Sequence, residues 1–313
     1  MITLRPGVVL VDVVRSDVVE SVHSGHVVIL DGDDVIELGD PRQPLFPRSS
    51  NKPLQAVGMR QLGLDVPPPQ LALAAASHSG EPQHIEGVSA MLASGGFGED
   101  DLGCPAAWPL DETARTDARG PRRITMNCSG KHAAMLLTCR TNGWPSKGYL
   151  AADHPLQLAL RNTVGQLAGE PVAAVGVDGC GAPLFALSLV GLARAFRRLA
   201  TADGGAERDV ADAMRAHPAL VAGSGRAATR LMAGVPGLIA KDGAEGVFAA
   251  ALPSGAAVAV KIDDGAQRAA ERVAVAALRR AGATGAVLDE LATGAVLGGG
   301  EPVGAIRVRP GVL

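Results

Sequence analysis

The sequence carries strand-like runs near both of its ends and helix-like runs between them, and this arrangement restricts the fold more than any other feature. The strand-like runs are rich in β-branched residues and are separated by turn residues. They are residues 7–14, 18–23, 26–30, 35–38, 247–251, 257–262 and 303–308. The pattern predicts an α+β protein in which an antiparallel sheet, built from both ends of the chain, is flanked by helices. We expect residues 303–308 to form an edge strand.

The middle of the chain, from roughly residue 50 to residue 235, is expected to be mostly helical. Within it, residues 172–177 form a short apolar run that predicts a buried strand leading into a turn. No internal repeat or low-complexity linker divides the 313 residues, and a chain of this length can bury one large core. We therefore expect a single domain over residues 1–313.

Charge and composition narrow the class of partner. The net charge is −3, so we expect neither nucleic acid nor a membrane surface, and a small molecule fits better. Uncharged stretches are too short for a spanning helix, and the first residues lack the basic and apolar regions of a secretory signal. The four cysteines have no regular spacing, which favours buried thiols or metal ligands over disulfides. We expect a cytoplasmic protein.

A serine and a lysine lie three residues apart in the sequence RSSNKP, which occupies residues 48–53. Residues i and i+3 of a helix share one face, so the amine of Lys52 could reach the hydroxyl of Ser49. Pro53 supports a helix start here, because the first N–H groups of a helix have no intrahelical partner. A neutral lysine in this position could activate the serine as a nucleophile. The four-residue pattern alone also fits a solvated helix start.

Two further segments support a catalytic role for this motif. Ser77 lies in the sequence SHS, at residues 77–79, and Lys241 begins the sequence KDG, just before a predicted strand. The order SxxK, SxS, KxG parallels the SxxK, SDN and KTG elements of class A β-lactamases and penicillin-binding proteins. Taken singly, Ser77 could cap a helix and Lys241 could be solvated beside a glycine turn. Together the three segments indicate serine and lysine chemistry.

A separate cluster is formed by NCSGKH at residues 127–132 and DGC at residues 178–180. Two thiols approached by a lysine and an imidazole could bind zinc, which prefers sulfur and nitrogen ligands. The alternative is that both cysteines are small buried apolar residues, since free cysteine is often buried. Asp178, in a glycine turn, could equally accept local backbone hydrogen bonds.

These segments, together with AHP at 216–218, VAG at 221–223 and VKIDDG at 260–265, resemble the rhizobial-type (class 3) L-asparaginases over roughly residues 5–265. The resemblance implies a fold similar to the serine β-lactamases and glutaminases, a homodimer, and hydrolysis of L-asparagine to L-aspartate and ammonia. It also assigns residues to three roles. These are catalysis by Ser49, Lys52, Ser77 and Lys241, substrate binding by Arg48, His132 and Asp178, and binding of one zinc ion per subunit by Cys128, Lys131 and Cys180.

Three features depart from the family pattern. Ser224 stands where an acidic residue is expected, Gly181 stands where the family often has asparagine, and the sequence AAW at residues 106–108 replaces a segment that contains histidine. Two other functions stay open. One is a glutaminase or a penicillin-recognising serine hydrolase that uses the same residues, and the other is a zinc-containing amino-acid-binding protein without turnover.

Overall fold

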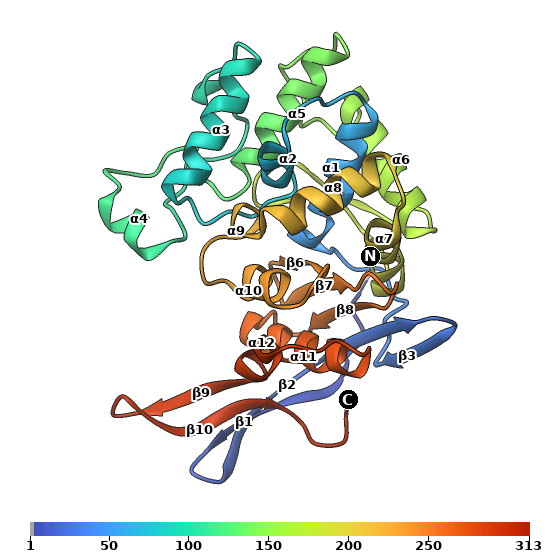
Figure 1. The fold of residues 1–313 in the computed structure, drawn as a ribbon, viewed down its shortest axis with the longest axis vertical. Helices are drawn as coiled ribbons and strands as arrows, with labels where there is room; N and C mark the ends of the chain where they lie inside the picture. The colour runs from blue at the N-terminus through green and yellow to red at the C-terminus, as the bar shows by residue number, and fades with distance from the viewer. Residues whose placement is uncertain (1–2) are drawn as a thin grey trace. The chain divides into compact units, whose positions relative to one another are not determined.

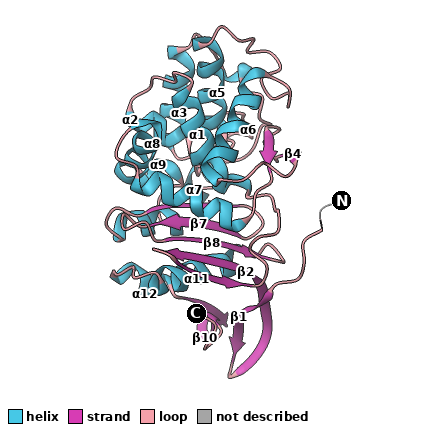
Figure 2. Cartoon of the chain, turned by 90° about the vertical axis from the view of Figure 1, so that its right-hand side faces the viewer, coloured by secondary structure: helices cyan, strands magenta, loops and turns pink. Residues whose placement is uncertain are grey.

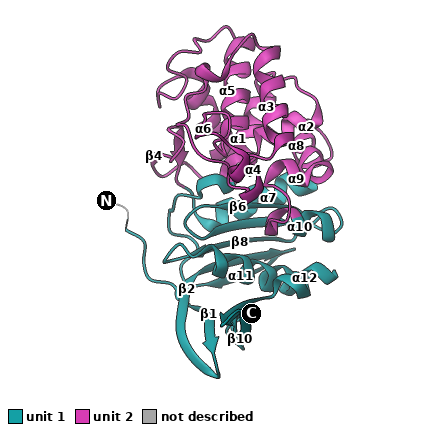
Figure 3. Ribbon diagram, turned by 90° about the vertical axis from the view of Figure 1, so that its left-hand side faces the viewer, with its two compact units in different colours: residues 1–50, 187–201, 230–313 teal, residues 51–186, 202–229 magenta. Residues whose placement is uncertain are grey.

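The computed structural model describes residues 3–313, and Figure 1 shows the order of the helices and strands along the chain. Two compact units are distinguished in Figure 3. Unit 1 consists of residues 1–50, 187–201 and 230–313, and unit 2 consists of residues 51–186 and 202–229. The segments of unit 1 therefore come from both ends of the chain and from one helix in its middle.

Unit 1 contains an eight-stranded antiparallel sheet with the order β6-β7-β8-β2-β1-β10-β9, to which β3 adds by pairing with β2. The strands are β1 (Val8–Arg15), β2 (Val18–Asp31), β3 (Asp34–Leu38), β6 (Ile239–Gly243), β7 (Val247–Ala251), β8 (Ala257–Ile262), β9 (Thr293–Gly298) and β10 (Glu301–Val308). The α+β class with an antiparallel sheet and helices, expected from the sequence, is confirmed.

The sheet curls because the long strand β2 changes partners along its length. Its first half pairs with β1, and its second half pairs with both β8 and β3. Gly25 lies at the change, where a Cβ atom would come within 2.2 Å of the carbonyl oxygen of Lys261. Only glycine allows the two backbones to approach this closely.

Strands β7 and β8 are buried along their whole length and carry apolar residues on both faces. Two helices of unit 1, α7 (Leu189–Thr201) and α11 (Gln267–Arg280), pack against both of these strands. Alternation of apolar and polar residues is lost here because a sheet covered on both faces has no solvated side. The short α12 (Ala286–Leu291) joins α11 to β9.

Unit 2 is mostly helical, as the cyan elements of Figure 2 show. Its helices are α1 (Lys52–Gln61), α2 (Pro68–Ala74), α3 (Pro82–Ser94), α4 (Glu112–Asp117), α5 (Ser129–Thr141), α6 (Pro155–Ala168), α8 (Gly205–Ala216), α9 (Pro218–Val221) and the start of α10 (Ala227–Gly234). Unit 2 also contains the 3₁₀ turn η2 (Glu99–Asp101) and the hairpin of β4 (Val175–Val177) and β5 (Pro183–Phe185). The 3₁₀ turn η1 (Arg48–Asn51) ends the first segment of unit 1, and only its last residue is counted in unit 2.

Helix α5 forms the centre of unit 2. Nearly all of its residues are buried, and α1, α2, α3 and α6 pack around it. Gly130, in its first turn, allows the close approach of α2, because a Cβ atom there would lie 2.5 Å from the carbonyl oxygen of Leu73. The residues that begin α5 are therefore held rigidly.

Two local predictions were wrong, and strands β6 and β9 were missed. Residues 172–177 do not form a buried strand, since β4 covers only Val175–Val177 and Val177 is 79% exposed. Strand β10 is not an edge strand, because it lies between β1 and the unpredicted β9. Lys241 does precede the predicted strand of residues 247–251, which is β7, but it also lies inside β6, a strand that was not predicted. In the part of the chain from residue 3 onward, no helix is both long and apolar enough to cross a membrane.

Candidate active site

The amine of Lys52 connects two of the predicted segments in unit 2. Lys52 is the first residue of α1, is only 1% exposed, and follows the 3₁₀ turn η1. Its Nζ donates hydrogen bonds to the carbonyl oxygen of Ala76 at 2.7 Å, to Oγ of Ser77 at 2.9 Å and to Sγ of Cys128 at 3.0 Å. The Lys52 amine thus has three hydrogen-bond partners. The partner serine of Lys52 in the structure is Ser77.

The loop that carries Ser77 is fixed by its backbone. The Ser77 N–H donates to the carbonyl oxygen of Val221 at 2.9 Å, and the His78 N–H donates to that of Asn127 at 3.1 Å. Nε2 of His78 lies 2.8 Å from Oγ of Ser129, at the start of α5. The loop is therefore attached both to the end of α9 and to the start of the central helix.

A carboxylate next to this loop explains the serine at position 224. Glu81 accepts hydrogen bonds from the N–H of Ser224 at 2.7 Å and from its hydroxyl at 2.8 Å. Gly223, with a φ of 137°, lies so close to Ser79 that a Cβ atom would be 2.1 Å from the serine hydroxyl. The acidic residue expected at position 224 is absent, but Glu81 supplies a carboxylate at the same turn.

We expect Glu81 to stabilise unit 2 in a pH-dependent way. Burial acts to raise the pKa of this carboxyl, but the hydrogen bonds from Ser224 and Gln83 outweigh it and hold the pKa below its ordinary value of 4.5. A carboxylate with a lowered pKa stabilises the fold above its unfolded pKa, and this contribution is lost as the pH falls through the folded value. Glu81→Gln should therefore lower the free energy of unfolding at neutral pH and flatten its decline below pH about 4.5.

Urea unfolding at several pH values measures this effect. Glu86→Gln is the matched control, because Glu86 lies on the same helix and is exposed. If the free energy of unfolding of Glu81→Gln fell as steeply at low pH as that of the wild type, Glu81 would not be the group that causes the pH dependence.

The thiols of Cys128 and Cys180 lie together beside two lysines. Cys128 is the N-cap residue of α5, and Nζ of Lys131, in the first turn, lies 3.4 Å from Sγ of Cys180. A hydrogen bond from Cys180 lowers the pKa of the Cys128 thiol against the effect of burial, and Lys52 and Lys131 lower it further. The same bond, with burial, raises the pKa of Cys180. Of the two thiols, Cys128 is the one whose anionic form is favoured, and its place at a helix N-terminus acts in the same direction.

These donors suit a zinc ion in their chemistry. A tetrahedral site with Zn–S distances of about 2.3 Å and Zn–N distances of about 2.0 Å separates its donors by about 3.5 Å, close to the separation of Lys131 and Cys180. Cys128, Lys131 and Cys180 are all buried, so they could hold an ion away from bulk water. Over residues 3–313, no group of three or more His, Cys, Asp or Glu side chains is placed to hold a metal, so a site here depends on the lysine as its third ligand.

Asp178 and His132 lie beside this cluster. Asp178 accepts a hydrogen bond from the N–H of Gly179 at 2.9 Å. Burial acts to lower the pKa of Lys131, but the nearby Cys180, Cys128 and Asp178 outweigh it and raise that pKa. The turn continues through Gly181 with a φ of 84°. Glycine and asparagine are the residues that adopt this left-handed conformation most readily, which explains the exchange from the family pattern.

Tyr149 is a buried residue at this cluster that the sequence motifs did not identify. Oη of Tyr149 lies 2.6 Å from Nδ1 of His132, and burial lowers the pKa of this imidazole. Tyr149 lies in the turn before α6, in no motif, and the only signal was that it is the single tyrosine of the chain.

The remaining predicted residues lie in unit 1. Arg48 has a φ of 51°, and its Nη1 lies 3.7 Å from Oε1 of Glu245. A left-handed non-glycine residue is strained and often marks a functional segment. Ser49 follows in η1 and is half-buried. Lys241 is fully buried in β6, and its Nζ donates to Oδ1 of Asp242 at 2.7 Å.

Strand β6 supports the segment that carries Ser49. A Cβ atom on Gly243 would lie 2.6 Å from the carbonyl oxygen of Pro47 and 3.1 Å from the N atom of Ser50. Because these are backbone atoms, they cannot move aside without shifting η1. We expect Gly243→Ala to lower the free energy of unfolding by about 1–3 kcal/mol, the usual range for overpacking.

Chemical denaturation measures this loss. Gly120→Ala is a suitable control, since a Cβ atom there meets nothing within 4 Å. An unchanged free energy of unfolding in Gly243→Ala would mean that η1 does not rest on β6.

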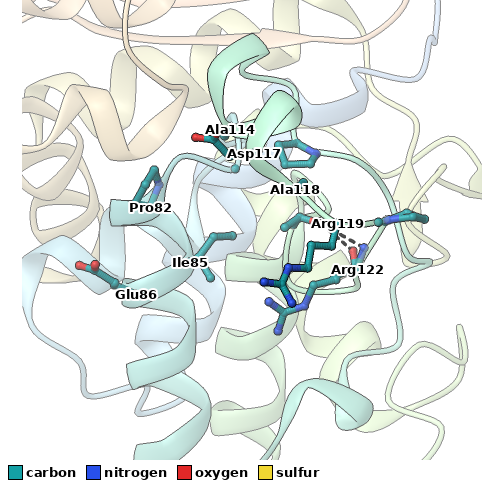
Figure 4. A pocket seen from close by; sticks show the side chains of 13 residues that line it. Pro82, Ile85, Glu86, Ala114, Asp117, Ala118, Arg119 and Arg122 are labelled. Carbon is teal, nitrogen blue, oxygen red and sulfur yellow. Dashed lines mark hydrogen bonds between the residues drawn. The ribbon is translucent and has the colours of Figure 1, made fainter.

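A separate cavity of about 710 Å³ in unit 2 contains none of the predicted site residues. Figure 4 shows Pro82, Ile85 and Glu86 of α3 on one side and the segment that carries Arg119 and Arg122 on the other. Gly80 also lines the cavity, so the cavity borders the loop that carries Ser77.

The sequence profile of the L-asparaginase II family matches residues 11–308. No curated protein matches the chain. Because the profile covers nearly the whole chain, the matched region includes all of the candidate site residues. The chain therefore belongs to the L-asparaginase II family, the rhizobial-type asparaginases.

Proposed function

We propose that the protein is an L-asparagine amidohydrolase that releases L-aspartate and ammonia through a serine nucleophile. Membership of the L-asparaginase II family supports amide hydrolysis. The observation that carries the proposal is the buried hydrogen bond of 2.9 Å between the Lys52 amine and the Ser77 hydroxyl. A lysine amine held on a serine hydroxyl can move a proton to or from it, which amide hydrolysis requires.

In the proposed reaction, neutral Lys52 accepts the hydroxyl proton of Ser49, and Oγ of Ser49 attacks the side-chain amide carbon of asparagine. The C–N bond breaks when the leaving nitrogen takes this proton from Lys52, so ammonia departs, Lys52 is neutral again and an ester to Ser49 remains. A water molecule then gives a proton to Lys52 and attacks the ester carbon. Lys52 passes this proton to Oγ of Ser49 as the ester C–O bond breaks, which frees aspartate and restores the Ser49 hydroxyl. Ser77 and Lys241 would relay protons and stabilise the oxyanion.

Substrate orientation is assigned to three side chains. The guanidinium of Arg48 suits the α-carboxylate of asparagine, because it can form two parallel hydrogen bonds with a carboxylate. Asp178 suits the α-ammonium group. His132 would line the same binding site.

Zinc is the expected cofactor, with Cys128, Lys131 and Cys180 as its ligands and one ion per subunit. When bound, it would supply a fixed positive charge that orients the substrate. Lys131 must lose a proton to become a ligand. The serine β-lactamase and glutaminase type of fold, the single domain, the homodimer and the cytoplasmic location remain predictions from the sequence.

Ammonia release from L-asparagine, measured in parallel with L-glutamine, tests the proposal. We expect release from asparagine. Preference for glutamine, or acylation by a β-lactam, would favour the alternative serine hydrolases. Calorimetric binding of asparagine without ammonia release would indicate an amino-acid-binding protein instead.

A further inference from the structure

The cavity of about 710 Å³ in unit 2 has two arginines on one wall and apolar side chains on another. Sites for small molecules usually have volumes of about 300–1,000 Å³. Arg119 and Arg122 belong to the segment that follows α4, and Pro82 and Ile85 belong to α3. In Figure 4 both arginine side chains extend toward α3, and Ile85 extends toward them. The cavity therefore places positive charge next to an apolar surface.

The structure holds Arg122 in place through both its backbone and its side chain. Its N–H and carbonyl groups pair with those of Ala107 in an antiparallel bridge, at 3.2 and 3.0 Å. Oγ1 of Thr125 accepts a hydrogen bond from the same N–H at 3.2 Å. The guanidinium forms an ion pair with Glu99 through Nη2. Because an arginine has five N–H donors, this ion pair leaves donors for a second anion.

The guanidinium of Arg119 has no such partner. It is exposed, and it forms no hydrogen bond or ion pair with residues 3–313. The carboxylates that line the cavity are those of Glu86 and Asp117. Figure 4 shows Glu86 extending away from the arginines, and Asp117 is exposed at the end of α4. The wall thus carries a positive charge that no ion pair of the described chain neutralises.

We propose that this cavity is a binding site for a small organic carboxylate, whose carboxylate group binds Arg119 and Arg122 and whose apolar part packs on Pro82 and Ile85. Guanidinium groups form charge-assisted and often bidentate hydrogen bonds with carboxylates. An inorganic anion would use the arginines but would leave the apolar surface in contact with water. The inference does not depend on the proposed hydrolysis, because no predicted catalytic, substrate-binding or zinc residue lines the cavity.

The cavity also borders the segment that supports the loop of Ser77. Pro109 lines the cavity, and the N–H groups of the next two residues, Leu110 and Asp111, both donate to the carbonyl oxygen of Ser79 at 2.9 Å. Ser79 lies in the same loop as Ser77. The experiment therefore has to separate this cavity from the proposed substrate site.

Benzoate is a suitable probe, because it combines a carboxylate with an apolar ring, and benzamide keeps the ring without the charge. Titration of the full chain, followed by saturation-transfer NMR, should show benzoate binding and at least about tenfold weaker binding of benzamide. Arg119→Gln should weaken benzoate binding about tenfold. Because Arg119 has no partner among residues 3–313, this variant should fold like the wild type.

Two further variants make the result specific. Arg115→Gln is the matched control, because Arg115 is exposed on α4 and does not line the cavity, and it should leave benzoate affinity unchanged. Arg48→Ala removes the residue assigned to the α-carboxylate of asparagine and should also leave benzoate affinity unchanged.

Benzoate binding that is lost in Arg48→Ala and kept in Arg119→Gln would place the probe at the substrate site and overturn the inference. Absence of benzoate binding by the wild type, equal binding of benzamide, or an equal loss in Arg115→Gln would overturn it as well. Ammonia release from asparagine tests the proposed function independently of these results.

Discussion

Lys52→Ala is expected to lower kcat for asparagine hydrolysis by at least about 10³-fold, which corresponds to about 4 kcal/mol of transition-state free energy. The change removes the proposed base. It also removes the donor to three groups, the carbonyl of Ala76, the hydroxyl of Ser77 and the sulfur of Cys128. An amine that is 1% exposed is not replaced by solvent, so its hydrogen bonds are lost without compensation.

Two variants make this result specific. Lys147→Ala removes an exposed lysine of the same unit and should leave kcat unchanged. Lys52→Arg keeps the positive charge but cannot give a neutral base, since arginine stays protonated in proteins. Turnover in Lys52→Arg close to that of the wild type would mean that Lys52 acts through its charge and not as a base. Circular dichroism establishes that each variant is folded.

The parts of the fold that could be predicted are those with a local signal. Strands β1, β2, β7 and β8 are β-branched or apolar runs bounded by turns, and they lie where such runs were expected. Strand β9 contains Gly294 and Gly298, which weaken any strand signal, and it forms because β10 pairs with it. Strand β6 was not predicted because it contains the charged residues Lys241 and Asp242, which are uncommon in buried strands. It forms because it pairs with β7, where Lys241 lies opposite Ala249.

The candidate site could be predicted by residue type but not by partner. The SxxK spacing indicates that Lys52 can reach Ser49, yet its hydrogen-bonded serine is Ser77, 25 residues away. Likewise, Glu81 and Ser224 are separated by 143 residues, so no motif connects them. Spacing predicts neighbours within one helix turn, whereas these contacts arise only when α9 and α5 converge on one loop.

The second prediction distinguishes the catalytic roles of Ser49 and Ser77. A nucleophile must touch the substrate, and Ser49 is half-buried, whereas Ser77 is only 3% exposed and its hydroxyl already accepts from Lys52. We therefore expect Ser49→Ala to lower kcat by about 10⁴-fold or more, because it removes the atom that forms the ester. Ser77→Ala should cost about 10²-fold, the size of a lost proton relay or oxyanion contact.

Mass spectrometry of the protein during slow turnover distinguishes these roles directly. Ser77→Ala should still accumulate the added mass of an aspartyl ester, whereas Ser49→Ala should not. Ser50→Ala is the adjacent control: its hydroxyl donates to the carbonyl oxygen of Pro47 at 2.6 Å, so its loss should lower stability by about 1 kcal/mol and leave ester formation intact. If the ester formed in Ser49→Ala and not in Ser77→Ala, the nucleophile would be the serine that Lys52 already holds. Ser49 would then be left to bind substrate or relay the proton.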